Sequence, residues 1–244
     1  MIVDGKYIHV KGHEKKIPLI WGLDYLSHDV LVWQLSGSEN FISYLAFFNS
    51  LKAIHYPLQT VVCDELESII LAAQTVYPKV HIQICTNHYK EGIRRLLRSR
   101  TTPEHEHFIK QIEFLFRKIN MRGYSKYAKK LFLEHNNNPI YRNILMGINN
   151  KHKILTRYLT DKHIPSTSNL IELYNSHLEA RLRSIKGFKS FYTAELWLNA
   201  YVLNRRLSKF TSCCKKFKKL NGVCSLSLTA KDNYPKIQFI KNAG

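Results

Sequence analysis

Three carboxylates occupy positions from which they could hold metal ions. Asp4 ends a first apolar run, Asp64 ends a second and opens a helix, and Glu172 lies near the start of a late helix. Three converging carboxylates can hold two divalent cations about 4 Å apart, and such a pair promotes phosphoryl transfer. The expected cofactor is Mg²⁺ or Mn²⁺ in a two-metal site, because these hard cations prefer oxygen ligands. The triad therefore points to a protein that cuts and joins nucleic acid.

Each of these acids also has a purely structural interpretation. Asp4 precedes a glycine and could mark a turn. Asp64 could cap a helix, with Glu67 three residues later completing a capping box. Asn169 and Glu172 have the same spacing. A capping residue can still bind a metal ion, so the two interpretations remain compatible.

Position strengthens the case for the three acids taken together. We expect Asp4 and Asp64 to end neighbouring strands of one sheet, at the edge where open α/β sheets place their sites. A helix packed across that sheet would bring Glu172 to them. Asp24, at the end of another predicted strand, is the strongest rival ligand.

Alternating and continuous apolar runs predict the elements that must position these acids. We expect five strands, at residues 1–10, 17–23, 30–35, 60–63 and 80–84. Helical spacing predicts helices from about 40 to 55 and at 65–76, 87–160, 170–186 and 193–207. Three consecutive strands favour an antiparallel meander, and strands reached through helices favour parallel pairing. The prediction is a mixed five-stranded sheet with flanking helices.

A Cys-x-x-His motif, Cys85 and His88, follows the fifth predicted strand. Such a pair could form half of a zinc site. The other half would have to come from Cys213, Cys214 or Cys224, which lack a standard spacing. We therefore favour a structural role near the catalytic edge. No Walker or Rossmann glycine-rich phosphate loop is present in the sequence.

Charge is distributed unevenly along the 244 residues. Residues 1–84 hold 6 Lys/Arg and 8 Asp/Glu, a net of −2, whereas residues 85–244 hold 31 and 10, a net of +21. So large an excess predicts a polyanionic partner, because bound phosphates release condensed counterions. No apolar run approaches the ~20 residues of a membrane span. No signal peptide is evident, and five irregularly spaced cysteines favour a reducing compartment.

Four segments, taken in order, resemble DDE transposases of the Mutator-like group, including their prokaryotic insertion-sequence relatives. Residues 2–7 resemble the strand that carries the first catalytic Asp in this group. Residues 37–40 resemble the segment with a Glu-Asn pair that follows the third strand. Residues 62–88 resemble the second Asp, the helix and strand that follow it, and the Cys-x-x-His signature. Residues 167–175 resemble the segment of the catalytic Glu, and the likeness continues through Ser190. It covers roughly residues 1–210.

The resemblance implies a ribonuclease-H-like fold with a helical insertion before the Glu-bearing helix. Asp4, Asp64 and Glu172 would then be the metal-binding catalytic triad. DNA, as transposon ends and target, is the implied partner, bound by a homodimer or larger assembly inside the cell. We expect DNA contacts from basic residues after Cys-x-x-His and around the C-terminal part of the Glu helix: Arg94, Arg95, Arg98, Arg181, Arg183, Lys186 and Lys189.

The resemblance also predicts a division of the chain. Residues 1–99 and 166–210 would form the ribonuclease-H-like core, 100–165 the helical insertion and 211–244 a basic tail. Members of the group usually carry a DNA-binding region ahead of the first Asp, and here Asp4 is the fourth residue. A non-catalytic DNA-binding remnant, or a ribonuclease-H-like nuclease acting on hybrids or branched DNA, are the alternative functions.

Overall fold

The computed structural model describes residues 1–99 and 101–230, which form two compact units. The first contains Met1–Val61, Glu67–Val80 and residues 169–230, and the second contains Val62–Leu66 and His81–Ser168. The predicted basic tail therefore belongs to the first unit as far as residue 230, and its remainder lies outside the described residues. No helix in the described part is long and apolar enough to cross a membrane.

Three consecutive strands form the antiparallel meander that the sequence predicts. β1 (Ile2–Ile8) pairs with β2 (Ile17–Leu23), and β2 pairs with β3 (Val30–Leu35). β2 is buried along its whole length because it has a strand on either side and apolar side chains on both faces. In this register Asp4 lies opposite Trp21.

The five strands follow the order β3-β2-β1-β4-β5 in a mixed sheet. β4 (Thr60–Cys63) is shared between the units, and β5 (His81–Ile84) belongs to the second. Within the first unit, the N-terminal ammonium of Met1 donates a hydrogen bond of 2.8 Å to the Thr60 carbonyl. The predicted five-stranded sheet is confirmed, as is the expectation that β1 and β4 are neighbours.

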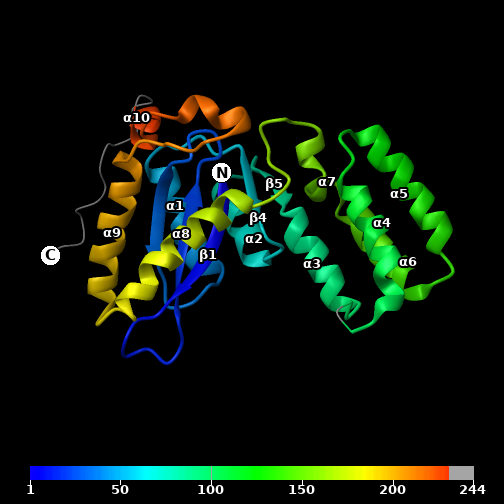
Figure 1. Ribbon diagram of the computed structural model, residues 1–244, viewed down its shortest axis with the longest axis horizontal. Helices are drawn as coiled ribbons and strands as arrows, with labels where there is room; N and C mark the ends of the chain where they lie inside the picture. Colours follow the sequence, from blue (N-terminus) through cyan, green and yellow to red (C-terminus); the bar gives the residue numbers. More distant parts are fainter. Residues whose placement is uncertain (100, 231–244) are drawn as a thin grey trace. The chain divides into compact units, whose positions relative to one another are not determined.

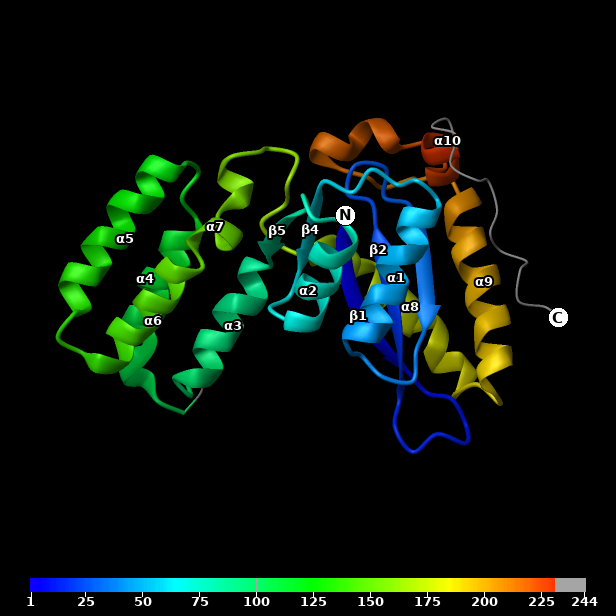
Figure 2. The same cartoon turned by 180° about the vertical axis from the view of Figure 1, so that it is seen from behind.

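Helices cover both faces of the sheet in the first unit. α1 (Phe41–Ala53) and α2 (Glu67–Val76) pack against each other on one face (Figure 2). Gly22 of β2 allows α1 to come close, because a Cβ there would lie 2.7 Å from the Phe47 ring. α8 (Asn169–Ile185) lies across β1 on the opposite face, and α9 (Phe191–Leu207) packs against β3 (Figure 1).

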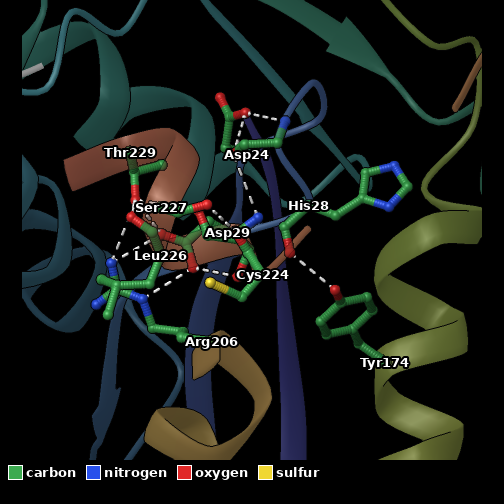
Figure 3. A network of polar contacts seen from close by, with 11 residues as sticks. Asp24, His28, Asp29, Tyr174, Arg206, Cys224, Leu226, Ser227 and Thr229 are labelled. Carbon is green, nitrogen blue, oxygen red and sulfur yellow. Dashed lines mark hydrogen bonds and ion pairs between the residues drawn. The ribbon is translucent and has the colours of Figure 1, made fainter. Parts of the chain in front are cut away.

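A short C-terminal segment is fastened to the turn between β2 and β3. It contains the 3₁₀ helix η3 (Lys215–Leu220) and α10 (Ser225–Thr229). The fully buried Asp29 carboxylate accepts hydrogen bonds from Arg206 of α9 (2.8 and 2.7 Å) and from the hydroxyls of Ser225 (2.8 Å) and Thr229 (2.6 Å) (Figure 3). The sequence predicted only a basic tail at residues 211–244, because Ser225 and Thr229 are 196 and 200 residues away from Asp29.

The second unit is helical between β5 and α8, as predicted. Its helices are α3 (Thr86–Leu96), η1 (Pro103–His105), α4 (Glu106–Phe116), α5 (Met121–His135), α6 (Pro139–Asn150), α7 (His152–Leu155) and η2 (Arg157–Leu159). Phe108 and Tyr141 stack at the centre of the helices, with ring centroids 4.0 Å apart. Asn138 caps α6 through its side chain, and Pro139 occupies the first turn, where a missing N–H costs nothing.

Candidate active site

Asp4 lies inside β1, as its third residue, and not at a strand end as predicted. The strand continues because pairing with β2 runs on to Ile8. Alternation along the strand then points Asp4 and Lys6 to one face and Gly5 and Tyr7 to the other. The interpretation of Asp4-Gly5 as a turn is therefore wrong, and Asp4 faces α8.

Both oxygens of the Asp4 carboxylate accept hydrogen bonds. The backbone N–H of Gly5 donates to Oδ1 at 2.9 Å, and the side-chain amide of Asn175 on α8 donates to Oδ2 at 2.7 Å. The carboxylate is half-buried. Donors on both oxygens fix its rotation, which is what an acid needs if it is to present a defined set of lone pairs to a ligand.

Asn175 is itself oriented by a buried donor. The indole Nε1 of Trp21 donates to its Oδ1 at 3.1 Å, which turns the amide NH₂ toward Asp4. Trp21 is 1% exposed and makes an edge contact with Tyr174, the preceding residue of α8. A chain of hydrogen bonds thus runs from β2 through α8 to β1.

Glu172 is the fourth residue of α8 and stands one turn before Asn175. The i, i+3 spacing places both on one side of the helix. Asn169 is the first residue of α8, so it is not the preceding cap that the capping-box interpretation requires. A salt bridge of 2.8 Å between Lys6 and Glu179 adds a second polar link between β1 and α8. The first unit therefore holds two of the three predicted acids on elements that pack together.

Asp24, the rival acid, is engaged in a turn. Its Oδ1 accepts hydrogen bonds from Leu26 N (3.0 Å), Ser27 N (2.7 Å) and the Ser27 hydroxyl (2.7 Å), and its Oδ2 accepts one from the Tyr56 hydroxyl. Burial opposes ionisation, but the hydrogen bonds from Tyr56 and Ser27 outweigh it and hold the pKa of Asp24 below its ordinary value. Asp24 therefore shapes the turn that precedes β3.

Asp64 directly follows β4 and belongs to the second unit. Its Oδ1 accepts a hydrogen bond from Leu66 N at 3.3 Å. α2 begins at Glu67, so Glu67 is its first residue and not the third residue that the predicted capping box requires. Asp64 is half-buried, and its placement after a strand next to β1 is as predicted.

Cys85 and His88 lie at the start of α3 in the second unit. Cys85 is fully buried, and its sulfur accepts hydrogen bonds from the backbone N–H (3.3 Å) and hydroxyl (3.2 Å) of Ser168. Burial alone would raise the pKa of the thiol, but hydrogen bonds from His88 and Ser168 lower it below its ordinary value. Thr86 N also donates to Ser166 O at 2.9 Å. The motif therefore ties the start of α3 to residues 166–168, which lead into α8.

The seven predicted DNA-binding residues differ in their surroundings. Arg94 pairs with Glu113 of α4 and with Glu91 (3.1 Å), and the hydrogen bond that its guanidinium donates to Glu113 raises the pKa of this guanidinium. Its charge is thus balanced within the second unit. The other six are exposed, two on α3 and its C-terminal turn, and four on α8 and the turn after it: Arg95, Arg98, Arg181, Arg183, Lys186 and Lys189.

A family model described as "Transposase, Mutator family" matches residues 2–205. The chain belongs to this family. The match includes all three predicted acids of the transposase and its Cys-x-x-His motif, and it confirms the resemblance inferred from sequence. Membership places the transposase among enzymes that transfer polynucleotide strands and gives it DNA as a partner. No curated protein matches the transposase.

Sequence reasoning missed two features of this transposase. Asn175 was recognised only as part of a matching segment, and its link to Trp21 could not be found without the register of β1 and β2. The second is the basic loop between β1 and β2, which contains Lys11, Lys15 and Lys16 and is joined to the turn after α8 by the hydrogen bond from Lys11 N to Phe188 O. The basic composition of that loop was the signal that could have found it.

Proposed function

We propose that this chain is the catalytic domain of a DDE-type transposase, with Asp4, Asp64 and Glu172 as its metal-binding triad. The fold would be ribonuclease-H-like, with the helical segment between β5 and α8 as an insertion. The enzyme would cleave DNA strands at transposon ends and join them to a target. It would work in association with DNA inside the cell, as a dimer or a larger assembly.

The observation that carries this proposal is the hydrogen bond from Asn175 to Asp4. It joins the strand of the first acid to the helix of the third, with Glu172 one turn from the contact. The second acid directly follows β4, which is the neighbour of β1 in the sheet. β1 carries the first acid, β4 leads into the second, and α8, which contacts β1, carries the third. This is the order that the family resemblance implies.

The donor set fits a magnesium or manganese site. All three side chains offer carboxylate oxygens, which hard divalent cations prefer, and two hydrogen bonds already orient Asp4. When bound, a pair of such ions supplies charge stabilisation at the attacking and leaving oxygens of phosphoryl transfer. The protein's own contribution is to hold the acids rigidly: β1 fixes Asp4 through its backbone, and α8 carries Glu172 on the helix that contacts it.

A strand-nicking and strand-transfer assay on duplex DNA with Mn²⁺ tests the triad. We expect Asp4→Asn, Asp64→Asn and Glu172→Gln each to reduce the rate at least 100-fold, because each replaces an anionic ligand by a neutral one of the same shape. Glu179→Gln is the matched control. It lies on the same helix as Glu172 and pairs with Lys6 at the surface, so it should retain activity.

The same assay separates the alternatives. Full activity in Asp64→Asn would refute the triad. DNA binding with neither nicking nor Mn²⁺ binding would identify a non-catalytic DNA-binding protein. Cleavage of RNA–DNA hybrids or branched DNA, without strand transfer, would identify a ribonuclease-H-like nuclease. Circular dichroism of each variant would show that lost activity does not come from lost fold.

A further inference from the structure

Two basic segments that are far apart in sequence meet in the first unit. One is the loop between β1 and β2, and the other is the turn between α8 and α9. They are joined by backbone hydrogen bonds from Phe188 N to His9 O (3.0 Å) and from Lys11 N to Phe188 O (2.8 Å), which form a parallel bridge between Val10 and Phe188. The two segments therefore form one continuous surface.

This surface is strongly positive. We define the loop–turn surface by its six exposed cations: Lys11, Lys15, Lys16, Arg183, Lys186 and Lys189. The only acids within these two segments and on the adjoining turn of α8 are Glu14 and Glu179, and Glu179 already pairs with Lys6. The pKa of Glu179 is lowered first by Lys6 and further by Arg183 and Lys16. Lys16 of the loop and Arg183 in the last turn of α8 thus act on the same carboxylate, which places their charges close together.

The backbone holds the turn in a shape that depends on glycine. Lys186 and Gly187 have φ angles of 55° and 99°, in the left-handed region where only glycine is unstrained. A Cβ on Gly187 would lie 2.6 Å from the imidazole Nδ1 of His9, so a larger residue here would have to displace the His9 ring. Phe188 is buried and packs on Trp197 of α9. The backbone positions from which these cations extend are therefore fixed.

We propose that the loop–turn surface binds the phosphate backbone of duplex DNA. Six cations with few acids among them can neutralise the phosphates of a polyanion. Lysine contacts to phosphates would position the DNA on the protein without reading the edges of its bases. The proposal uses the DNA binding of the family and goes beyond the proposed active site, because it adds residues 11–16, which the sequence interpretation did not include. It is independent of metal ions and of the triad.

The test is duplex binding, measured in EDTA over a range of salt concentrations. The double variant Lys15→Glu with Lys16→Glu is compared with Lys129→Glu with Lys130→Glu, an exposed pair on α5. Both change the net charge by the same amount, so the control removes any effect of overall charge. Losing two phosphate contacts should lower the slope of log affinity against log salt by about 2, because each contact contributes about 0.9.

We expect the loop variant to lose at least tenfold in affinity at low salt and to show the smaller slope, while the α5 variant loses less than threefold. Lys189→Glu, on the turn, should also lower the slope, because both segments would contact the same duplex. Equal losses in the loop and α5 variants, or unchanged binding in the loop variant, would overturn the proposal. The binding assay contains no metal ion, whereas the nicking assay measures the triad, so failure of this surface and failure of the triad give different results.

Discussion

Replacing Asn175 by alanine tests the link between β2, α8 and β1 most sharply. The variant removes the donor to Asp4 Oδ2 and the acceptor of the Trp21 indole N–H. Trp21 is 1% exposed, so its N–H would be left buried without a partner. Nothing in the backbone of α8 has to change, because alanine is the best helix former.

The magnitude follows from the two lost hydrogen bonds. A hydrogen bond to a charged group contributes about 1.5–3 kcal/mol, and a buried donor without a partner costs about 1–3 kcal/mol. Because one amide makes both bonds, their losses overlap. We expect the free energy of unfolding to fall by about 2–4 kcal/mol. Asp4 would also lose the donor that fixes its rotation, so Mn²⁺ affinity should fall at least fivefold.

Urea unfolding without metal measures the first effect, and calorimetric titration of the folded protein with Mn²⁺ measures the second. Tyr174→Phe is the matched control: it removes a buried hydrogen bond of α8, from the hydroxyl to His28 O (2.8 Å), that does not involve Asp4. This control should lose stability but keep its Mn²⁺ affinity. The reasoning would be refuted if Asn175→Ala bound Mn²⁺ as the wild type does, or if both variants lost affinity equally.

Three further variants test the surroundings of the site. Gly5→Ala should lower the free energy of unfolding, measured in urea, by about 1–3 kcal/mol, because the added Cβ would collide with the Glu39 carboxylate. That carboxylate is held in place by hydrogen bonds from Tyr7 and Tyr44. Gly37→Ala is the control and should change little, because a Cβ there would have nothing within 4 Å. Asp29→Asn should cost about 3–5 kcal/mol by leaving buried Arg206 without its counter-ion, and an unchanged unfolding midpoint would contradict this. Burial beside Phe210 and Phe217 lowers the pKa of His28 from 6.5 to about 4, although the charge of Asp24 acts in the opposite direction. Between these two pH values the unfolded chain binds more protons than the folded protein. The free energy of unfolding should therefore fall as the pH falls from about 6.5 to 4. His28→Asn, which tolerates the positive φ of this position, should make that pH dependence shallower, and an unaltered slope would show that another group titrates.

Local pattern was sufficient to predict most of the regular structure. The apolar runs gave β2 and β3 their observed bounds, and helical periodicity located α1, α2, α8 and α9 to within a few residues. Connection lengths predicted the mixed sheet, because strands joined by short loops pair antiparallel and those reached through helices cross over. These elements are determined by residues close together in the chain, so local patterns in the sequence are enough to predict them.

Features that depend on distant partners could not be predicted. Asp4 was expected at a strand end although the predicted strand covered residues 1–10, and the pairing of β1 with β2 shows that it lies inside the strand. The same register brings Trp21 to Asn175, 154 residues later in the chain. Asp29 lies in the turn before β3, and its bonds to Arg206 of α9 and Thr229 of α10 join it to partners 177 and 200 residues away. The role of the three acids stays a prediction.

The most direct test of the central claim is the metal preference of Asp64→Cys. A thiolate is a softer ligand than a carboxylate and is poorly suited to Mg²⁺, whereas Mn²⁺ tolerates it better. If Asp64 is a ligand of the catalytic ions, the ratio of nicking rates in Mn²⁺ and Mg²⁺ should rise at least tenfold in this variant relative to the wild type. An unchanged ratio, with activity retained in Mg²⁺, would contradict the account.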